Sequence, residues 1–235
     1  MTHKSPEEVA LEYSKLFGEK DGAIVHRLTD TVTQLYYEWR LFLYFFCGPI
    51  ERVNALNKAS GITSKVLQRL LWDNAVLKVR ALTDPMGNGS NQNLSLGHLV
   101  RISEQFGINS LRPALSETEA KTNRCRKYAT KYLAHKGYHH AVGSKVTGLT
   151  RGETTAAIEA IRDFIRKFHG EVRDVDYFLT PIMDAGNEER FLAFLHYGAI
   201  HNENLRSQEE EDIRDCAEFC ALAPFVTPWE SGLRT

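Results

Sequence analysis

The stretch DGAIVHRLTDTVTQLYYEWRLFLYFFC, residues 21–47, decides the fold of this chain. Its apolar side chains recur at intervals of three or four residues: Leu28, Val32, Leu35, Tyr36, Trp39, Phe42 and Phe46. Such spacing places them along one face of an α-helix, and Gly48-Pro49 ends the pattern. The stretch therefore predicts a long helix that buries one face against neighbouring helices.

Helical signals continue on both sides of this stretch. Ser5 followed by Pro6 is typical of a helix start, and Thr150 with Glu153 is typical of a capping box. We expect further helices over residues 62–82, 94–106 and 111–135, from Thr150 onward, from Asn187 onward and over residues 209–222. No sustained alternation of apolar and polar residues predicts a strand. The sequence therefore predicts an all-α fold.

Helical spacing also predicts which side chains of residues 62–82 face the core. These are Val66, Leu67, Leu70, Leu71, Ala75, Leu77, Ala81 and Leu82. Two irregular stretches rich in Gly and polar residues, 86–93 and 136–150, interrupt the helices that follow.

Composition excludes several classes of protein. With 29 Lys and Arg against 30 Asp and Glu, the formal net charge is -1, which excludes a polybasic binder of the histone kind. Four cysteines are too few and too scattered for a disulfide-stapled secreted fold. The acidic N-terminus lacks the apolar run of an export signal, and residues 41–47 are far fewer than the ~20 that a membrane span needs. We therefore expect a cytoplasmic protein without a membrane-spanning helix.

The segment that carries chemistry is basic and lies at residues 121–137. Arg124, Tyr128, Lys131 and His135 follow one another at helical intervals and share one face, whereas Arg126 points to the opposite side. A histidine near neutral pH can exchange a proton while a neighbouring lysine holds a phosphate. The alternative, which the residues leave open, is a basic helix end that complements the helix dipole.

Other candidate sites are weaker. Cys216 and Cys220 are one helical turn apart and could bind zinc together with His196 or His201. A structural zinc site, however, needs four ligands at tighter spacing. We expect His139 and His140 to lie in an exposed loop. Arg80 and Asp84 are one helical turn apart, so we expect them to form a local ion pair. We expect no metal and no cofactor, and the sequence holds no phosphate-binding glycine loop or zinc-protease motif.

Several short runs resemble one known family. They are Tyr132-Leu-Ala-His-Lys136, Arg80-Ala-Leu-Thr-Asp-Pro85, Asn93-Leu-Ser-Leu96 and Leu149-Thr-Arg-Gly-Glu153. In order and spacing they are similar to the AbiU-type abortive-infection branch of the HEPN superfamily, over roughly residues 25–180. The resemblance implies an all-α HEPN-like helical bundle, usually dimeric, in which two subunits form one cleft.

The resemblance also implies a function and its residues. Active HEPN proteins are metal-independent ribonucleases with an Arg-x(4–6)-His motif, whose His moves protons and whose Arg stabilises phosphate charge. By this resemblance, His135 is the catalytic histidine and Lys131 the family's lysine, while the motif arginine falls on Ala129. Arg124, Lys127, Tyr128 and Lys136 would contact phosphate or RNA.

Two hypotheses follow. In the first, the protein is a metal-independent endoribonuclease of the abortive-infection or toxin–antitoxin kind. In the second, it is a non-catalytic module that binds a nucleotide or a protein, as Ala129 in the arginine position suggests. We expect an HEPN-like bundle at residues 1–180 and a C-terminal helical extension at 181–235 packed on the same domain. The expected partners are a second copy of the chain, RNA or a nucleotide, and a toxin or antitoxin protein.

Overall fold

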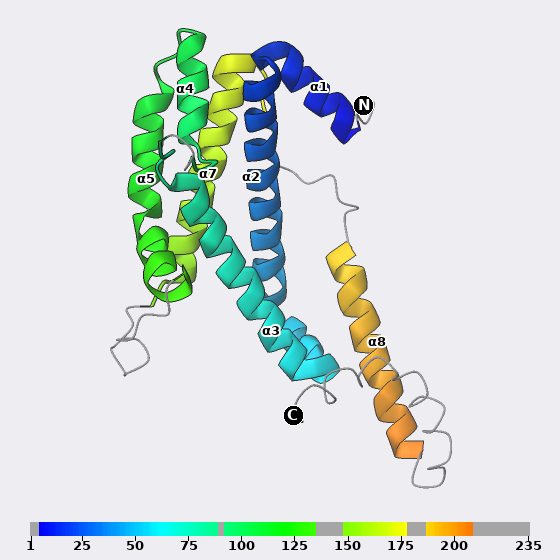
Figure 1. Ribbon diagram of the computed structural model, residues 1–235. Helices are drawn as coiled ribbons and strands as arrows, with labels where there is room; N and C mark the ends of the chain where they lie inside the picture. Colours follow the sequence, from blue (N-terminus) through cyan, green and yellow to red (C-terminus); the bar gives the residue numbers. More distant parts are fainter. Residues whose placement is uncertain (1–4, 89–91, 135–147, 178–186, 209–235) are drawn as a thin grey trace, which may run out of the picture.

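The computed structural model describes residues 5–88, 92–134, 148–177 and 187–208 (Figure 1). Its helices are α1 (Pro6–Phe17), α2 (Glu19–Phe46), α3 (Ile50–Thr83), α4 (Gly97–Gln105), α5 (Leu111–Tyr128), the π-helix η1 (Ala129–Ala134), α7 (Arg151–Arg173) and α8 (Asn187–Gln208). No β-strand occurs in these ranges. The predicted all-α helical bundle is therefore confirmed.

The core lies where α2 and α7 pack together with α3, α4 and α5 (Figure 1). The α2 face predicted by helical spacing is largely buried, with Leu28, Val32 and Leu35 at most 1% exposed. Trp39 stacks on Phe42 with ring centroids 4.8 Å apart. Because α7 contributes Phe164 and Phe168 to the same cluster, α2 and α7 together form the centre of the core.

A close helical hairpin joins α1 to α2. Ser5 caps α1 at the helix start that the sequence predicts, and Glu8 completes a capping box with it. Gly18 makes the turn to α2 with φ +81°. At Gly22 the backbones of the two helices meet so closely that a Cβ atom would lie 2.6 Å from the Tyr13 carbonyl oxygen. Glycine is therefore the only residue that fits this crossing without displacing backbone.

A buried histidine lies under this hairpin. His169 of α7 is 0% exposed, and its Nδ1 accepts a hydrogen bond from Arg173 Nη1 at 3.4 Å. Nε2 therefore carries the ring proton and donates it to Thr29 Oγ1 of α2 at 3.1 Å. Burial, together with the Arg173 charge, lowers the pKa of His169 to about 3. The imidazole is therefore a neutral part of the core.

The predicted core face of α3 is partly wrong. Val66, Leu70 and Leu77 are 51%, 60% and 39% exposed, and Ala81 is also exposed. The reason is that α3 bends at Ser60 (φ -169°, ψ 104°) and crosses the bundle obliquely (Figure 1), so neighbouring helices cover a different face. The buried positions of its C-terminal half are Ala75, Val76, Val79, Leu82 and Thr83.

Two predicted helix boundaries also differ from the structure. The helix expected over residues 94–106 begins at Gly97, because Leu94–Leu96 precede the first helical turn of α4. The helix expected over residues 111–135 is α-helical only to Tyr128 and continues as the π-helix η1.

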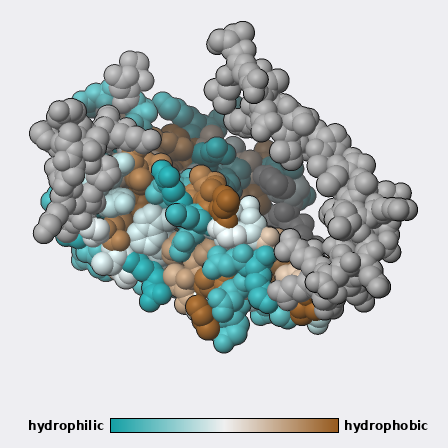
Figure 2. Space-filling view, turned by 90° about the horizontal axis from the view of Figure 1, so that it is seen from below, coloured by the Kyte–Doolittle hydropathy of each residue, from teal (hydrophilic) through white to brown (hydrophobic). Residues whose placement is uncertain are grey.

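α8 packs beside α3 at the lower end of Figure 1. Leu192 forms a small apolar cluster with Phe45 and Leu56, and Phe191 contacts Phe45 edge to face. Other side chains of α8, such as Phe194 at 75% exposed, face solvent, and Figure 2 shows hydrophobic patches among hydrophilic residues when the molecule is seen from below. The helix expected at residues 209–222, with Cys216 and Cys220, lies outside the described residues.

No helix in the described part of the chain is long and apolar enough to cross a bilayer.

Candidate functional site

Four residues predicted to act on phosphate line one pocket, which we call the α5–η1 pocket. It has a volume of about 200 Å³ and is lined by Arg124, Lys127, Tyr128, Lys131, Tyr132 and Leu149. The first three come from the last turns of α5, the next two from η1, and Leu149 precedes α7. The structure therefore gathers Arg124, Lys127, Tyr128 and Lys131 at one concave surface.

Helix geometry explains why these side chains converge. Lys127, Tyr128 and Lys131 follow Arg124 by three, four and seven residues, so all project from one side of the helix. The change from α5 to η1 falls between Tyr128 and Lys131. π-Helical turns are rare and occur frequently at functional sites.

Arg124 is held at the rim of the pocket by the start of α7. Its Nε lies 3.3 Å from Glu153 Oε1, and its Nη2 donates to the Gly148 carbonyl oxygen at 3.4 Å. Glu153 also closes the α7 capping box by accepting from the Thr150 backbone N–H at 2.8 Å. These hydrogen bonds from Thr150, and then the Arg124 charge, lower the pKa of Glu153, so its carboxylate is ionised near neutral pH. Arg124 is therefore oriented but remains 52% exposed.

Two aromatic rings form one wall of the pocket. The centroids of Tyr128 and Tyr132 are 5.0 Å apart with an angle of 52° between the planes. Lys131 Nζ lies 5.2 Å from the centroid of the Tyr132 ring, within cation–π range. Burial raises the pKa of Tyr128, with the Asp73 charge adding to the effect, so its phenol stays neutral.

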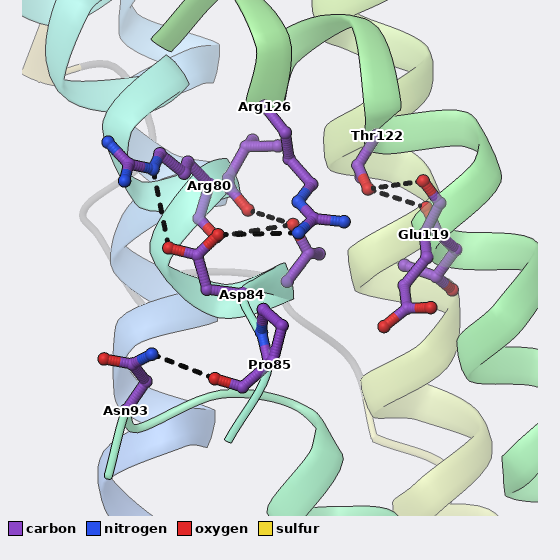
Figure 3. A network of polar contacts seen from close by, with 10 residues as sticks. Arg80, Asp84, Pro85, Asn93, Glu119, Thr122 and Arg126 are labelled. Carbon is purple, nitrogen blue, oxygen red and sulfur yellow. Dashed lines mark hydrogen bonds and ion pairs between the residues drawn. The ribbon is translucent and has the colours of Figure 1, made fainter. Parts of the chain in front are cut away.

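The opposite side of α5 has a structural role. Figure 3 shows Arg126 of α5 directed at Asp84, which also pairs with Arg80. The nearest N–O distances are 3.6 Å from Arg126 and 3.4 Å from Arg80, and Asn93 donates to the Pro85 carbonyl oxygen below them. The predicted Arg80–Asp84 pair is present, and Arg126 extends it to tie α5 to the end of α3. Neither Arg126 nor Asp84 lines the α5–η1 pocket.

Ala129, the position to which the resemblance assigns the motif arginine, does not face the pocket. It is 0% exposed and belongs to the main core cluster. An arginine here would have to bury its guanidinium among apolar side chains, which is costly. The cations that line the pocket are instead Arg124, Lys127 and Lys131.

Several predicted residues lie outside the described ranges. They are His135, Lys136, the His139-His140 pair, Cys216 and Cys220. His196 and His201 lie on α8, and no group of three or more metal-ligating side chains occurs among the residues that the structure describes.

Sequence reasoning missed three residues of the site. Tyr132 lies four residues after Tyr128, a spacing that could have indicated a ring pair. Leu149 and the Arg124–Glu153 ion pair depend on how α5 and α7 pack, and no local signal predicts that.

Comparison with known families agrees with this picture. The model of the AbiU2 family of HEPN domains matches residues 19–187, a range that includes the α5–η1 pocket and helices α2, α3, α4, α5 and α7. No curated protein and no solved structure is significantly similar to the chain. The chain belongs to the AbiU2 family of HEPN domains and is an HEPN-type abortive-infection protein.

Proposed function

We propose that this protein is a metal-independent endoribonuclease whose phosphate-binding surface is the α5–η1 pocket. The observation that carries the proposal is the convergence of Arg124, Lys127 and Lys131 with the two tyrosine rings. Basic side chains beside aromatic rings are the combination that binds phosphate and base in RNA.

The proposed chemistry needs a proton carrier next to a held phosphate. Arg124 and Lys131 stabilise the charge that develops on the phosphate as the ribose 2′-OH attacks the phosphorus. His135, four residues after Lys131 in the sequence, accepts the 2′-OH proton as the bond from the 2′-oxygen to phosphorus forms. The imidazolium returns this proton to the 5′-oxygen as the bond from phosphorus to that oxygen breaks, which leaves a 2′,3′-cyclic phosphate and a 5′-OH. Lys136 adds positive charge beside His135. This scheme requires no metal ion.

A second function, binding of RNA or a nucleotide without cleavage, is favoured by Ala129. Because residue 129 is a buried alanine, the arginine position of the motif carries no cation. Loss of one preorganised hydrogen-bond donor costs on the order of 100- to 1000-fold in rate. In this case the same pocket binds phosphate and base, and His135 performs no chemistry.

Cleavage of a single-stranded RNA by the purified full chain in excess EDTA tests the first function. We expect cleavage that His135→Ala abolishes and that Arg124→Ala slows by about 100-fold. Arg112→Ala is the matched control, because Arg112 is on the same helix and is paired with Glu104 at 2.6 Å, away from the pocket. Its rate should equal that of the wild type.

The outcomes separate the two functions. RNA that stays intact but binds in a manner dependent on Arg124 supports the binding module. Cleavage that persists in His135→Ala contradicts the proposed chemistry.

The proposal includes a homodimer. Ile62, Val66, Leu70 and Leu77 form one exposed apolar face of α3, with Ile62 82% exposed. Contiguous exposed apolar surface of this kind is typical of protein–protein interfaces. The face adjoins the site, since Asp73 lies among these residues and its charge acts on Tyr128.

The proposal also includes a toxin or antitoxin protein as a partner and a cytoplasmic location. It further includes the division of the chain into an HEPN-like bundle at residues 1–180 and a C-terminal extension at residues 181–235.

A further inference from the structure

We propose that Tyr132, supported by Tyr128, stacks on a nucleobase of single-stranded RNA and so selects bases exposed from a strand. This inference rests on the proposed RNA function and adds to it the feature of the substrate that the pocket recognises. It assigns to Tyr132 a part in binding that is separate from the phosphate contacts of Arg124 and Lys131.

The first argument is that Tyr132 lines the pocket and lies outside the hydrophobic core. Tyr128 packs against the main hydrophobic cluster, but neither cluster formed by the described residues includes Tyr132. Its ring contacts Tyr128 and lines the α5–η1 pocket instead. A large aromatic side chain that lines a basic pocket outside the core is placed to contact a ligand bound in that pocket.

The second argument is the size and shape of the pocket. A cavity of about 150 Å³ holds a benzene ring, so the volume of about 200 Å³ here suits one aromatic ring. The tilt of 52° between Tyr128 and Tyr132 makes an angled wall with Leu149 as a further apolar contact. Such a wall suits one planar group.

The third argument is the order of charges around the rings. Lys127 and Lys131 flank Tyr128 in the sequence, and Lys131 Nζ lies near the Tyr132 ring. A phosphate held by these cations places the base of the same or the next nucleotide within reach of the ring wall. Bases in a duplex are stacked on one another and cannot enter, whereas bases of a single strand can.

An oligonucleotide without bases separates stacking from phosphate contacts. The full chain is titrated with a fluorescently labelled single-stranded oligoribonucleotide whose 2′-OH groups are methylated, so that it cannot be cleaved. A second titration uses an abasic oligomer with the same number of phosphates. Because stacking on an aromatic side chain contributes about 5- to 100-fold per base, we expect the first to bind more tightly than the second by this factor.

Variants of Tyr132 decide the proposal. Tyr132→Leu should remove the preference for the base-bearing strand, while the abasic strand still binds. Tyr132→Phe, which keeps the ring, should retain the preference, and Arg124→Ala should weaken both strands alike. A cooperative thermal unfolding transition shows that Tyr132→Leu is folded.

The failure of this proposal can be distinguished from the failure of the proposed function. A preference that survives Tyr132→Leu, or that Tyr132→Phe also removes, overturns stacking while RNA binding stands. A wild-type chain that binds neither oligomer overturns both.

Discussion

At the scale of single residues, Glu153 competes with the phosphate that we propose Arg124 binds. Its carboxylate both caps α7 and pairs with Arg124. Glu153→Gln keeps the capping box, since glutamine also serves at this position, but removes the negative charge. We expect oligonucleotide affinity to rise about two- to fivefold at low salt, measured by fluorescence anisotropy.

Glu171→Gln is the matched control for that change. Glu171 lies on the same helix and pairs with Lys167 at 2.7 Å, so its substitution should leave the affinity unchanged. Weaker binding by Glu153→Gln would show instead that the carboxylate holds Arg124 in its productive orientation.

The burial of Ala129 predicts how an arginine at this position would change the stability of the fold. Ala129→Arg should destabilise the fold by about 3 kcal/mol or more, because it buries a charge that has no partner in the core. Thr130→Arg, at the exposed neighbouring position, should change stability by less than about 0.5 kcal/mol. Urea unfolding of both variants measures the difference, and equal stabilities would contradict the burial of Ala129.

His169 predicts how stability depends on pH. Since its pKa is about 3 in the folded chain and near 6.5 when unfolded, protons bind preferentially to the unfolded state below pH 6.5. The stability from neutral His169 is complete above pH 6.5 and is lost as the pH falls toward 3, on the order of 1 kcal/mol per pH unit.

Unfolding of His169→Gln measures this contribution. Glutamine does not titrate, so the variant should lose less stability than the wild type between pH 7 and pH 4. Parallel pH profiles for the two proteins would refute a buried neutral imidazole.

At the scale of helices, the α1–α2 crossing depends on one glycine. Gly22→Ala places a methyl group 2.6 to 2.7 Å from backbone atoms of Tyr13 and Ser14, which cannot move aside as a flexible side chain could. We expect a loss of about 2 to 4 kcal/mol or a displaced α1. Gly170→Ala in α7, where nothing lies within 4 Å of the new atom, should stabilise the chain by about 0.5 to 1 kcal/mol. Thermal unfolding of the two variants measures whether Gly22→Ala lowers and Gly170→Ala raises the stability.

The helices also show what the sequence could and could not predict. Ser5 and Thr150 mark helix starts through side-chain hydrogen bonds that are local, so both helix starts were predictable. The exposed face of α3 was not, because a periodic apolar pattern does not reveal which neighbours cover it. At the site, helical spacing alone places Arg124 and Lys131 on a common face. The pairing of Arg124 with Glu153 depends on how α7 packs against α5, which the local sequence does not reveal.

At the scale of the whole molecule, the exposed α3 face predicts how copies of the chain associate. Leu70→Glu introduces a charge at a 60% exposed position, so it should leave the fold intact and weaken the proposed homodimer by at least tenfold. Light scattering across a concentration series measures the mass of each protein. Gln68→Glu, also exposed on α3 but outside the apolar face, is the control, and a wild-type chain that stays monomeric would contradict the dimer.

The π-helix η1 has a consequence for how related chains are aligned. A turn closed by an i→i+5 hydrogen bond contains one residue more than an α-helical turn, yet its two ends occupy nearly the same places in space. The Arg-x(4–6)-His spacing implied by the family resemblance varies by such single residues. An alignment without a gap at residues 129–134 therefore assigns the motif arginine to buried Ala129, whereas a shift of one residue assigns it to exposed Thr130.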